Sequence, residues 1–193
     1  MTEQAEIEAV VEAVLFAANE PIGEPRLLEL FPDDDRKRVL AAVDAVLERY
    51  AERPNRGVMA ERVAGGVRLA TRPELAGWLR RFFDIRGRQR LSMAALETLA
   101  IVAYRQPVSG PEIQELRGVN SSAVLKTLLE RRLIRIAGRK PVVGKPFLYA
   151  TTREFLVQFG LSSLQDLPPL EEFEELAQPG SGRAVEEAAA SSE

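Results

Sequence analysis

The sequence predicts a mainly α-helical fold with small β hairpins, which places it in the α+β class. Apolar residues recur at the spacing of amphipathic helices through most of the chain, and in residues 58–71 the period changes to two, as in a hairpin. The same order of predicted elements occurs again after residue 90. These observations predict two similar domains within the 193 residues of the chain.

Three helices and a hairpin are predicted in the first half. Residues 6–18 form the first helix, because their apolar members share one helical face, and a proline-containing turn follows. Pro25 opens a short second helix. The third helix has an apolar stripe from Val39 to Tyr50, and its positive N-terminal end suits the three aspartates that precede it, Asp33, Asp34 and Asp35. The hairpin 58–71 has Gly65-Gly66 at its centre, and residues 73–83 return to helix.

The second half repeats this order of elements, and some aligned residues are identical. At an offset of 86, residues 15–30 fall on 101–116 with five identities, Ala17/Ala103, Pro21/Pro107, Pro25/Pro111, Glu29/Glu115 and Leu30/Leu116. At an offset of 80, residues 69–74 fall on 149–154. The predicted elements are helices at 92–104, 111–116 and 121–132, strands at 133–137 and 147–150, and a closing helix at 152–159.

Helix, helix, helix and hairpin is the order of a winged helix-turn-helix, so the chain is predicted to hold two such domains in tandem. The first covers residues 1–84 and the second 91–160, with an Arg-rich connection at 85–90. Residues 161–177 form an extension rich in Leu, Pro and acidic residues. The segment 178–193 lacks hydrophobic periodicity and is predicted to be a disordered acidic tail.

The composition excludes several kinds of chemistry. The chain has 26 Lys plus Arg, 29 Asp plus Glu, a net charge of −3, and neither His nor Cys. Zinc fingers, iron-sulfur clusters, disulfides and His-assisted nucleophiles are therefore excluded, and no metal, cofactor or catalytic site is expected. Ser122 and Lys126 are spaced as a Ser-Lys dyad, but the favoured interpretation is a helix N-cap region at 120–122 followed by an exposed Lys.

The chain shows no signal for a membrane. Its longest uninterrupted apolar stretches are six residues, as in 99–104, which is far below the roughly 18 needed for a span. The first residues are acidic, whereas a secretory signal begins with basic ones. A cytoplasmic protein is therefore expected.

Charge is unevenly distributed, which makes nucleic acid a partner to consider. Residues from 166 onward carry −7, so residues 1–165 carry +4. Six cations without an intervening acid lie in the second half, Arg131, Arg132, Arg135, Arg139, Lys140 and Lys145. A winged helix often reads DNA with its third helix. Here that helix begins with aspartates in the first domain and lacks clustered Asn, Gln and Arg in the second. The wing at 138–145 can touch phosphates non-specifically, and a DNA-binding transcriptional regulator is the alternative function.

Apolar residues outside the predicted cores favour protein binding. In the helix 73–83, Leu75, Leu79 and Phe82 make one stripe, and Trp78 and Phe83 extend the apolar arc beyond what one small core needs. Such a surplus predicts an interface at Trp78 and Phe83, although the stripe can also close the first core. The second wing carries rigid or apolar residues with no evident core to face, Pro141, Val142, Val143 and Pro146.

The second half resembles a known family over about 80 residues. Residues 91–108 read LSMAALETLAIVAYRQPV, and they are followed by RGVNS at 117–121, TLLER at 127–131, GRK at 138–140, GKP at 144–146, YATTREFL at 149–156 and FGLSSLQDLPPL at 159–170. This series is similar to the segregation and condensation protein B family, an accessory subunit of bacterial SMC–kleisin complexes. The first half resembles the family more loosely, through EAVLFA at 12–17 and its element order. One departure is Ser109-Gly110-Pro111, where the family more often has Thr or Ser, then Arg and Ala.

The resemblance implies a non-enzymatic subunit of a condensin-like complex that compacts and segregates chromosomes. It implies a homodimer formed through the first domain, to which Trp78 and Phe83 are assigned. It also implies that the second domain binds the central segment of the kleisin, segregation and condensation protein A, and Val142, Val143, Pro146 and Phe147 are assigned to that contact. The resemblance further implies that the protein contacts the SMC ATPase through the kleisin and contacts DNA only indirectly or weakly. The protein is expected in the cytoplasm, associated with the nucleoid.

Overall fold

A computed structural model describes residues 3–32, 35–52, 55–83 and 91–169. The chain divides into two compact units, Met1–Ser163 and Leu164–Glu193. In the second unit the described residues contain one 3-10 turn, Leu164–Asp166. The predicted connection at 85–90 and the predicted tail at 178–193 lie outside the described residues, as do Asp33 and Asp34. The structure is mainly helical with small antiparallel sheets, which confirms the predicted fold class at that level.

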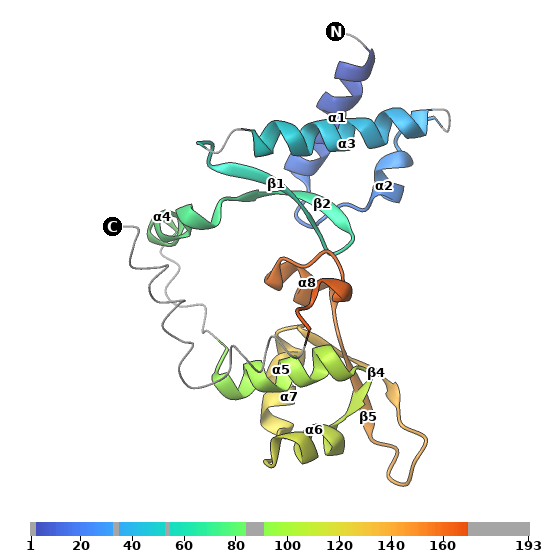
Figure 1. The fold of residues 1–193 in the computed structure, drawn as a ribbon, viewed down its shortest axis with the longest axis vertical. Helices are drawn as coiled ribbons and strands as arrows, with labels where there is room; N and C mark the ends of the chain where they lie inside the picture. The colour runs from blue at the N-terminus through green and yellow to red at the C-terminus, as the bar shows by residue number, and fades with distance from the viewer. Residues whose placement is uncertain (1–2, 33–34, 53–54, 84–90, 170–193) are drawn as a thin grey trace. The chain divides into compact units, whose positions relative to one another are not determined.

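The first half begins with three helices, α1 Glu3–Ala17, α2 Glu24–Leu28 and α3 Arg36–Ala51 (Figure 1). Their apolar stripes meet in one buried cluster, with α1 and α3 as its main contributors. The cluster contains Ile7, Val11, Leu15, Ile22, Leu27, Val39, Ala42, Val43, Val46 and Val67. Asp35 stands at the N-cap of α3, where its carboxylate accepts a hydrogen bond from Arg38 at 2.9 Å.

A two-stranded antiparallel hairpin follows, with β1 Val58–Val63 and β2 Gly66–Thr71. Its turn residues are Ala64 and Gly65, both with positive φ (51° and 69°), so the predicted centre at Gly65-Gly66 was wrong by one residue. Gly66 instead pairs with Val63 as the first residue of β2. Its lack of a side chain serves another purpose, because a Cβ there would lie 2.8 Å from the carbonyl carbon of Ile22.

Replacing Gly66 with Ala should lower the free energy of unfolding by ~1–3 kcal/mol, as is usual for overpacking. The Ile22 backbone is held in place, because it exchanges hydrogen bonds of 2.8 and 2.9 Å with Val67. A shift away from the added methyl group would break them. Gly77→Ala is the matched control, since nothing lies within 4 Å of its added Cβ and its helix should gain from Ala. Chemical denaturation measures both, and equal stability of the Gly66→Ala protein and the wild type would contradict the expectation.

The segment after the hairpin forms a 3-10 turn, Pro73–Leu75, and a short helix, α4 Ala76–Phe82. None of the residues in either element is buried. The alternative in which the stripe of Leu75, Leu79 and Phe82 closes the first core is therefore not realised within this chain. Leu79 alone of the three is half-buried.

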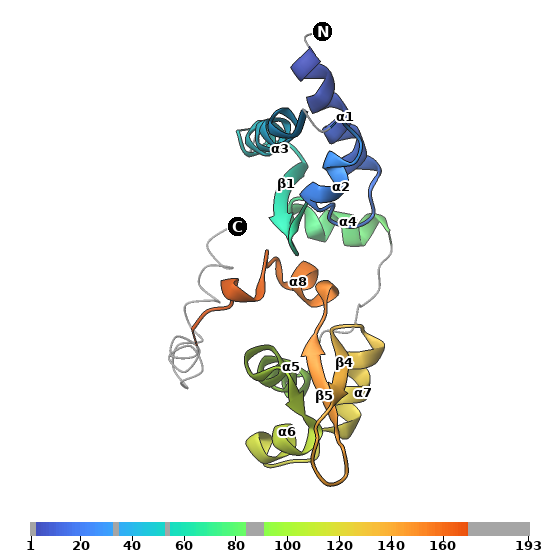
Figure 2. The same ribbon diagram turned by 90° about the vertical axis from the view of Figure 1, so that its right-hand side faces the viewer.

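The second half begins with three helices, α5 Met93–Arg105, α6 Gly110–Arg117 and α7 Ser122–Glu130 (Figure 2). Local signals in the sequence explain their ends. Ser92 caps α5 by accepting from the Ala95 N–H, Ser109 and Glu112 form a capping box at the start of α6, and Gly118 ends α6 with φ 68°. Buried apolar residues of this half include Leu99, Val102, Ile113, Leu125, Leu128, Leu133 and Ile134.

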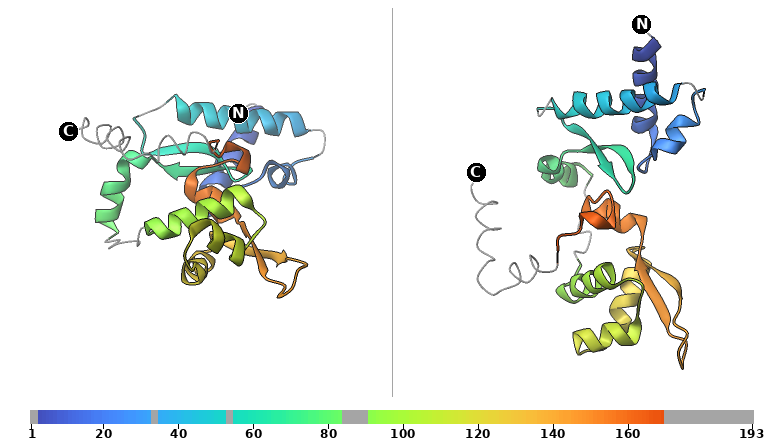
Figure 3. Two further views of the ribbon diagram at one scale, coloured as in Figure 1. Left: turned by 60° about the horizontal axis from the view of Figure 1, so that its bottom comes forward. Right: turned by 45° about the vertical axis from the view of Figure 1, so that its right-hand side comes forward.

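The sheet of the second half has three antiparallel strands in the order β3-β5-β4, with β3 Val108–Ser109, β4 Ile134–Arg139 and β5 Phe147–Thr151. The helix α8 Arg153–Phe159 follows β5. The hairpin of β4 and β5 was predicted, but β3 was not. Two residues give no periodicity, and Val108 and Ser109 become a strand because they pair with Tyr149 and Leu148. The loop between β4 and β5 projects beyond the helices of this half (Figures 1 and 3).

Candidate protein-binding surfaces

The loop at residues 140–146, here called the second wing, presents apolar side chains to solvent. Val143 is fully exposed and Val142 is about half exposed, while Phe147, at the start of β5, is also exposed. Pro146 is half-buried at the base of the wing. The structure thus places all four residues assigned to kleisin binding on one short stretch of chain. Their role in binding stays a prediction.

The second wing is internally hydrogen-bonded. Lys140 N–H donates to the Pro146 carbonyl, Val142 N–H to the Lys140 carbonyl, and Lys145 N–H to the Val142 carbonyl, each at 2.9 Å. Arg139 donates from Nη1 to the Lys145 carbonyl at 3.0 Å, and its guanidinium lies 4.0 Å from the centre of the Phe147 ring. The wing therefore holds its apolar residues in a defined geometry, which lowers the entropy lost on binding.

An ion pair joins the base of the wing to α6. The Lys140 Nζ lies 2.6 Å from Glu112 Oε1, and the same carboxylate accepts the Ser109 backbone N–H at 2.9 Å. The hydrogen bond from Lys140, followed by those from the Ser109 side chain and backbone, lowers the pKa of Glu112 from its ordinary value of 4.5 to about 2. This pair is one contact between the base of the wing and the start of α6.

Replacing Lys140 with Met should raise the pKa of Glu112 towards 4.5, because the largest cause of its depression is removed. A depressed carboxyl pKa adds stability above about pH 4.5 that is lost as the pH falls towards 2. The variant should therefore lose less thermal stability than the wild type over that interval. An NMR titration of the Glu112 carboxyl measures the pKa, with Lys145→Met as the control, and an unchanged midpoint in the Lys140→Met protein would contradict the expectation.

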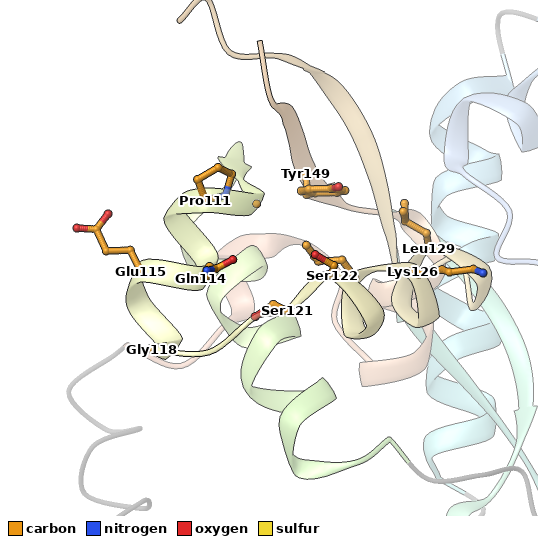
Figure 4. A pocket seen from close by; sticks show the side chains of 11 residues that line it. Pro111, Gln114, Glu115, Gly118, Ser121, Ser122, Lys126, Leu129 and Tyr149 are labelled. Atoms are coloured by element: carbon orange, nitrogen blue, oxygen red, sulfur yellow. The ribbon is translucent and has the colours of Figure 1, made fainter. Parts of the chain in front are cut away.

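A groove of about 680 Å³ lies between α6 and α7 beneath β5. Figure 4 shows Tyr149 along one side, above Ser122 and beside Leu129, with Gln114 and Glu115 of α6 on the other. Gly110 and Pro111, at which the sequence departs from the family pattern, also line it. The sequence did not predict this groove, because it arises only where three separate elements meet.

Ser122 and Lys126 both line this groove. Ser122 N–H donates to the Asn120 side chain at 2.9 Å, as expected for an N-cap region, and Lys126 lies 3.9 Å from Glu130. Both observations agree with the structural interpretation of these residues rather than the catalytic one. Among the described residues no group of three or more Asp or Glu is arranged to hold a metal ion.

The helix α4 carries a second apolar surface. Trp78, Phe82 and Phe83 expose 70%, 81% and 63% of their area. The two Phe rings meet edge to face with their centres 5.0 Å apart, and the Arg81 guanidinium lies 5.5 Å from the Trp78 ring. We call Trp78, Phe82 and Phe83 the α4 patch. The sequence assigned Phe82 to the core stripe, and its exposure adds it to the interface candidates.

These features define a protein with exposed apolar and aromatic surfaces. A soluble monomer rarely exposes three adjacent aromatic rings unless they serve as an interface. No helix in the described ranges is both long and apolar enough to cross a membrane.

Comparison with known proteins identifies the family. The model of the family "Segregation and condensation complex subunit ScpB" matches residues 9–170. Segregation and condensation protein B of Syntrophotalea carbinolica is 52% identical over 171 residues, which covers 89% of this chain and 85% of that one. The protein of the same name from Symbiobacterium thermophilum is 47% identical over 84% of this chain and 73% of its own length. The crystal structure of ScpB from Mycobacterium tuberculosis covers 83% of this chain and 99% of that one at 33% identity, with a TM-score of 0.39. The chain belongs to the ScpB family, which confirms the resemblance found in the sequence.

Proposed function

We propose that this protein is a non-enzymatic subunit of an SMC–kleisin complex that acts in chromosome condensation and segregation. The observation that carries the proposal is the family match across residues 9–170, together with 52% identity to a segregation and condensation protein B. In this proposal the two helix-and-hairpin halves are tandem winged helices, at 1–84 and 91–160. The protein acts in the cytoplasm at the nucleoid, without contact to membranes.

The second half binds the central segment of the kleisin, segregation and condensation protein A, which links it to the SMC ATPase. The exposed apolar side chains of Val142 and Val143, on a hydrogen-bonded wing, support this assignment. Pro146 and Phe147 extend the surface at the base of the wing. A kleisin segment whose apolar side chains pack on this surface would bury both its own apolar side chains and those of the wing.

The first half forms a homodimer through the α4 patch, with Trp78 and Phe83 as its centre. Exposed aromatic residues are the type most often found at the energetic centres of protein interfaces. A two-fold symmetric dimer would bring the patch of one protomer against that of the other and cover both.

Titration of the full-length protein with the purified kleisin, followed by calorimetry and light scattering, tests the proposal. We expect a stable complex containing two copies of this chain. Absence of binding to the kleisin would overturn the function.

The alternative function, a winged-helix DNA-binding regulator, is favoured by the exposed cations of the second half, Arg131, Arg132, Arg135 and Arg139. Because a protein that neutralises several phosphates loses affinity steeply as salt rises, a regulator would show tight duplex binding with a steep salt dependence. We expect only weak binding to duplex DNA at physiological salt, as measured by fluorescence anisotropy. Tight binding to one DNA sequence at that salt would support the regulator instead.

A further inference from the structure

The strand β4 is the outer strand of its sheet, and its free edge is long for so small a domain. In the order β3-β5-β4, no described strand pairs with the far side of β4. Of its six residues only Ile134 is buried, and all those from Arg135 to Arg139 are exposed. An exposed edge of this kind is a template for pairing with another chain.

The register shows which backbone groups lie on the open side. Hydrogen-bonded and non-hydrogen-bonded pairs alternate in an antiparallel ladder. Thr152 N–H donates to the Leu133 carbonyl at one end of the hairpin, and Lys140 N–H to the Pro146 carbonyl at the other. Arg135 opposite Ala150 is therefore a bonded pair, while Ile134 and Ile136 direct their N–H and C=O groups away from β5. Ile134 is buried, so of these two residues only Ile136 offers its backbone groups to a partner.

Charge on this edge disfavours pairing with a second copy of the chain. Arg135 and Arg139 lie on β4, and no acidic residue occurs between positions 131 and 145. Two copies pairing through this edge would bring like charges together, whereas an acidic strand would bring opposite ones. The edge thus selects for a partner with acidic residues.

An apolar contact is available in the middle of the edge. Ile136 is about half exposed and lies opposite Tyr149, which lines the groove between α6 and α7. Cross-strand neighbours share one face of a sheet, so a strand added beside β4 would place one of its side chains next to Ile136. An apolar residue fits there, between the acidic residues that face Arg135 and Arg139.

We propose that the edge of β4 binds an extended partner segment as a fourth strand of the sheet, and that this segment carries acidic residues on either side of an apolar one. The inference rests on the proposed function, which makes the central segment of the kleisin the occupant. Main-chain hydrogen bonds from Ile136 supply part of the affinity, and the arginines and the Ile136 side chain select the sequence. The wing residues Val142 and Val143 then contact the chain that continues beyond this strand.

Amide hydrogen exchange in the full-length protein tests the pairing directly. The probe is a set of overlapping synthetic peptides that cover the central segment of the kleisin. We expect one acidic peptide to slow exchange at the Ile136 amide by at least ~10-fold, because a new hydrogen bond protects it. The Arg135 amide, already bonded within the sheet, should change less.

Variants separate backbone pairing from side-chain contact. Ile136→Pro removes the outward N–H without removing a bond to β5, and we expect it to weaken peptide binding at least ~10-fold. Ile136→Val keeps both the N–H and a β-branched side chain and is the control. Arg135→Glu should also weaken binding, and a peptide with its acidic residues changed to Lys should restore it. Arg26→Glu makes the same change of charge on an exposed residue of α2 and should have no effect.

Three results would overturn the strand addition. If the kleisin binds the Ile136→Pro protein with full affinity and no peptide protects the Ile136 amide in the wild type, the edge is not the site, although the proposed function stands. If the kleisin does not bind the wild-type protein, both proposals fall. If duplex DNA binds at Arg135 while none of the peptides does, and the affinity for DNA falls steeply as salt rises, the edge binds phosphates and not a strand.

Discussion

Replacing Val142 and Val143 together with Asp should weaken binding to the kleisin at least ~100-fold. Both side chains project from the second wing and contribute nothing to a core, so the fold should persist. Each new carboxylate would be buried without a partner in an apolar contact, at a cost of several kcal/mol, and every 1.4 kcal/mol is about tenfold in affinity. Isothermal titration calorimetry with the purified kleisin measures the change.

Val119→Asp provides the matched control, because Val119 is another exposed valine in a loop of the same half. It should leave the affinity within about twofold of the wild type. Equal losses from Val119→Asp and from the double variant would mean that added negative charge alone weakens binding. Unchanged affinity in the double variant would remove the wing from the interface.

Replacing Trp78 and Phe83 together with Ala should convert the proposed dimer into monomers at micromolar concentration. Each aromatic ring can bury roughly 150–250 Å² at an interface. In a two-fold symmetric contact every substitution occurs twice, so four rings are lost at once. Light scattering should show the mass falling from that of two 21.4 kDa chains towards that of one.

Phe16→Ala is the control for this pair. Phe16 is as exposed as Phe82 but lies on α1, so the dimer should survive its loss. A dimer that persists in the Trp78→Ala, Phe83→Ala protein and dissociates in the Phe16→Ala protein would place the contact on α1 instead.

The helices could be predicted from the sequence because their causes are local. The apolar spacing of residues 6–18 and the Ser92 cap both act within a few residues, and the observed bounds of α1 and α5 differ from the predicted ones by only a few positions. The strand β3 could not be predicted, because Val108 and Ser109 are extended only through pairing with β5, which lies some 40 residues further along the chain.

The candidate surfaces were predictable to different degrees. An apolar pair such as Val142 and Val143 in a loop rich in Pro and Gly has no periodicity that would bury it, so its exposure follows from the sequence. Phe82 shares a helical face with Leu75 and Leu79, which favoured burial. Phe82 is exposed because residues of α1, α2, α3 and the hairpin make up the first core, and α4 contributes no residue to that core. The sequence alone does not show this. The groove beside Tyr149 and the open edge of β4 depend on which elements become neighbours, and the sequence contains no local signal for either.

The exposure of α4 also has a consequence for when this helix forms. A helix of seven residues is too short to persist in water by itself, because helices below about 12–15 residues lack the bonds to offset nucleation. With no buried residue, α4 has little support from its own chain. If the α4 patch is the dimer contact, the helix gains its stability from the second protomer, so folding of this segment and assembly of the dimer become one concentration-dependent event.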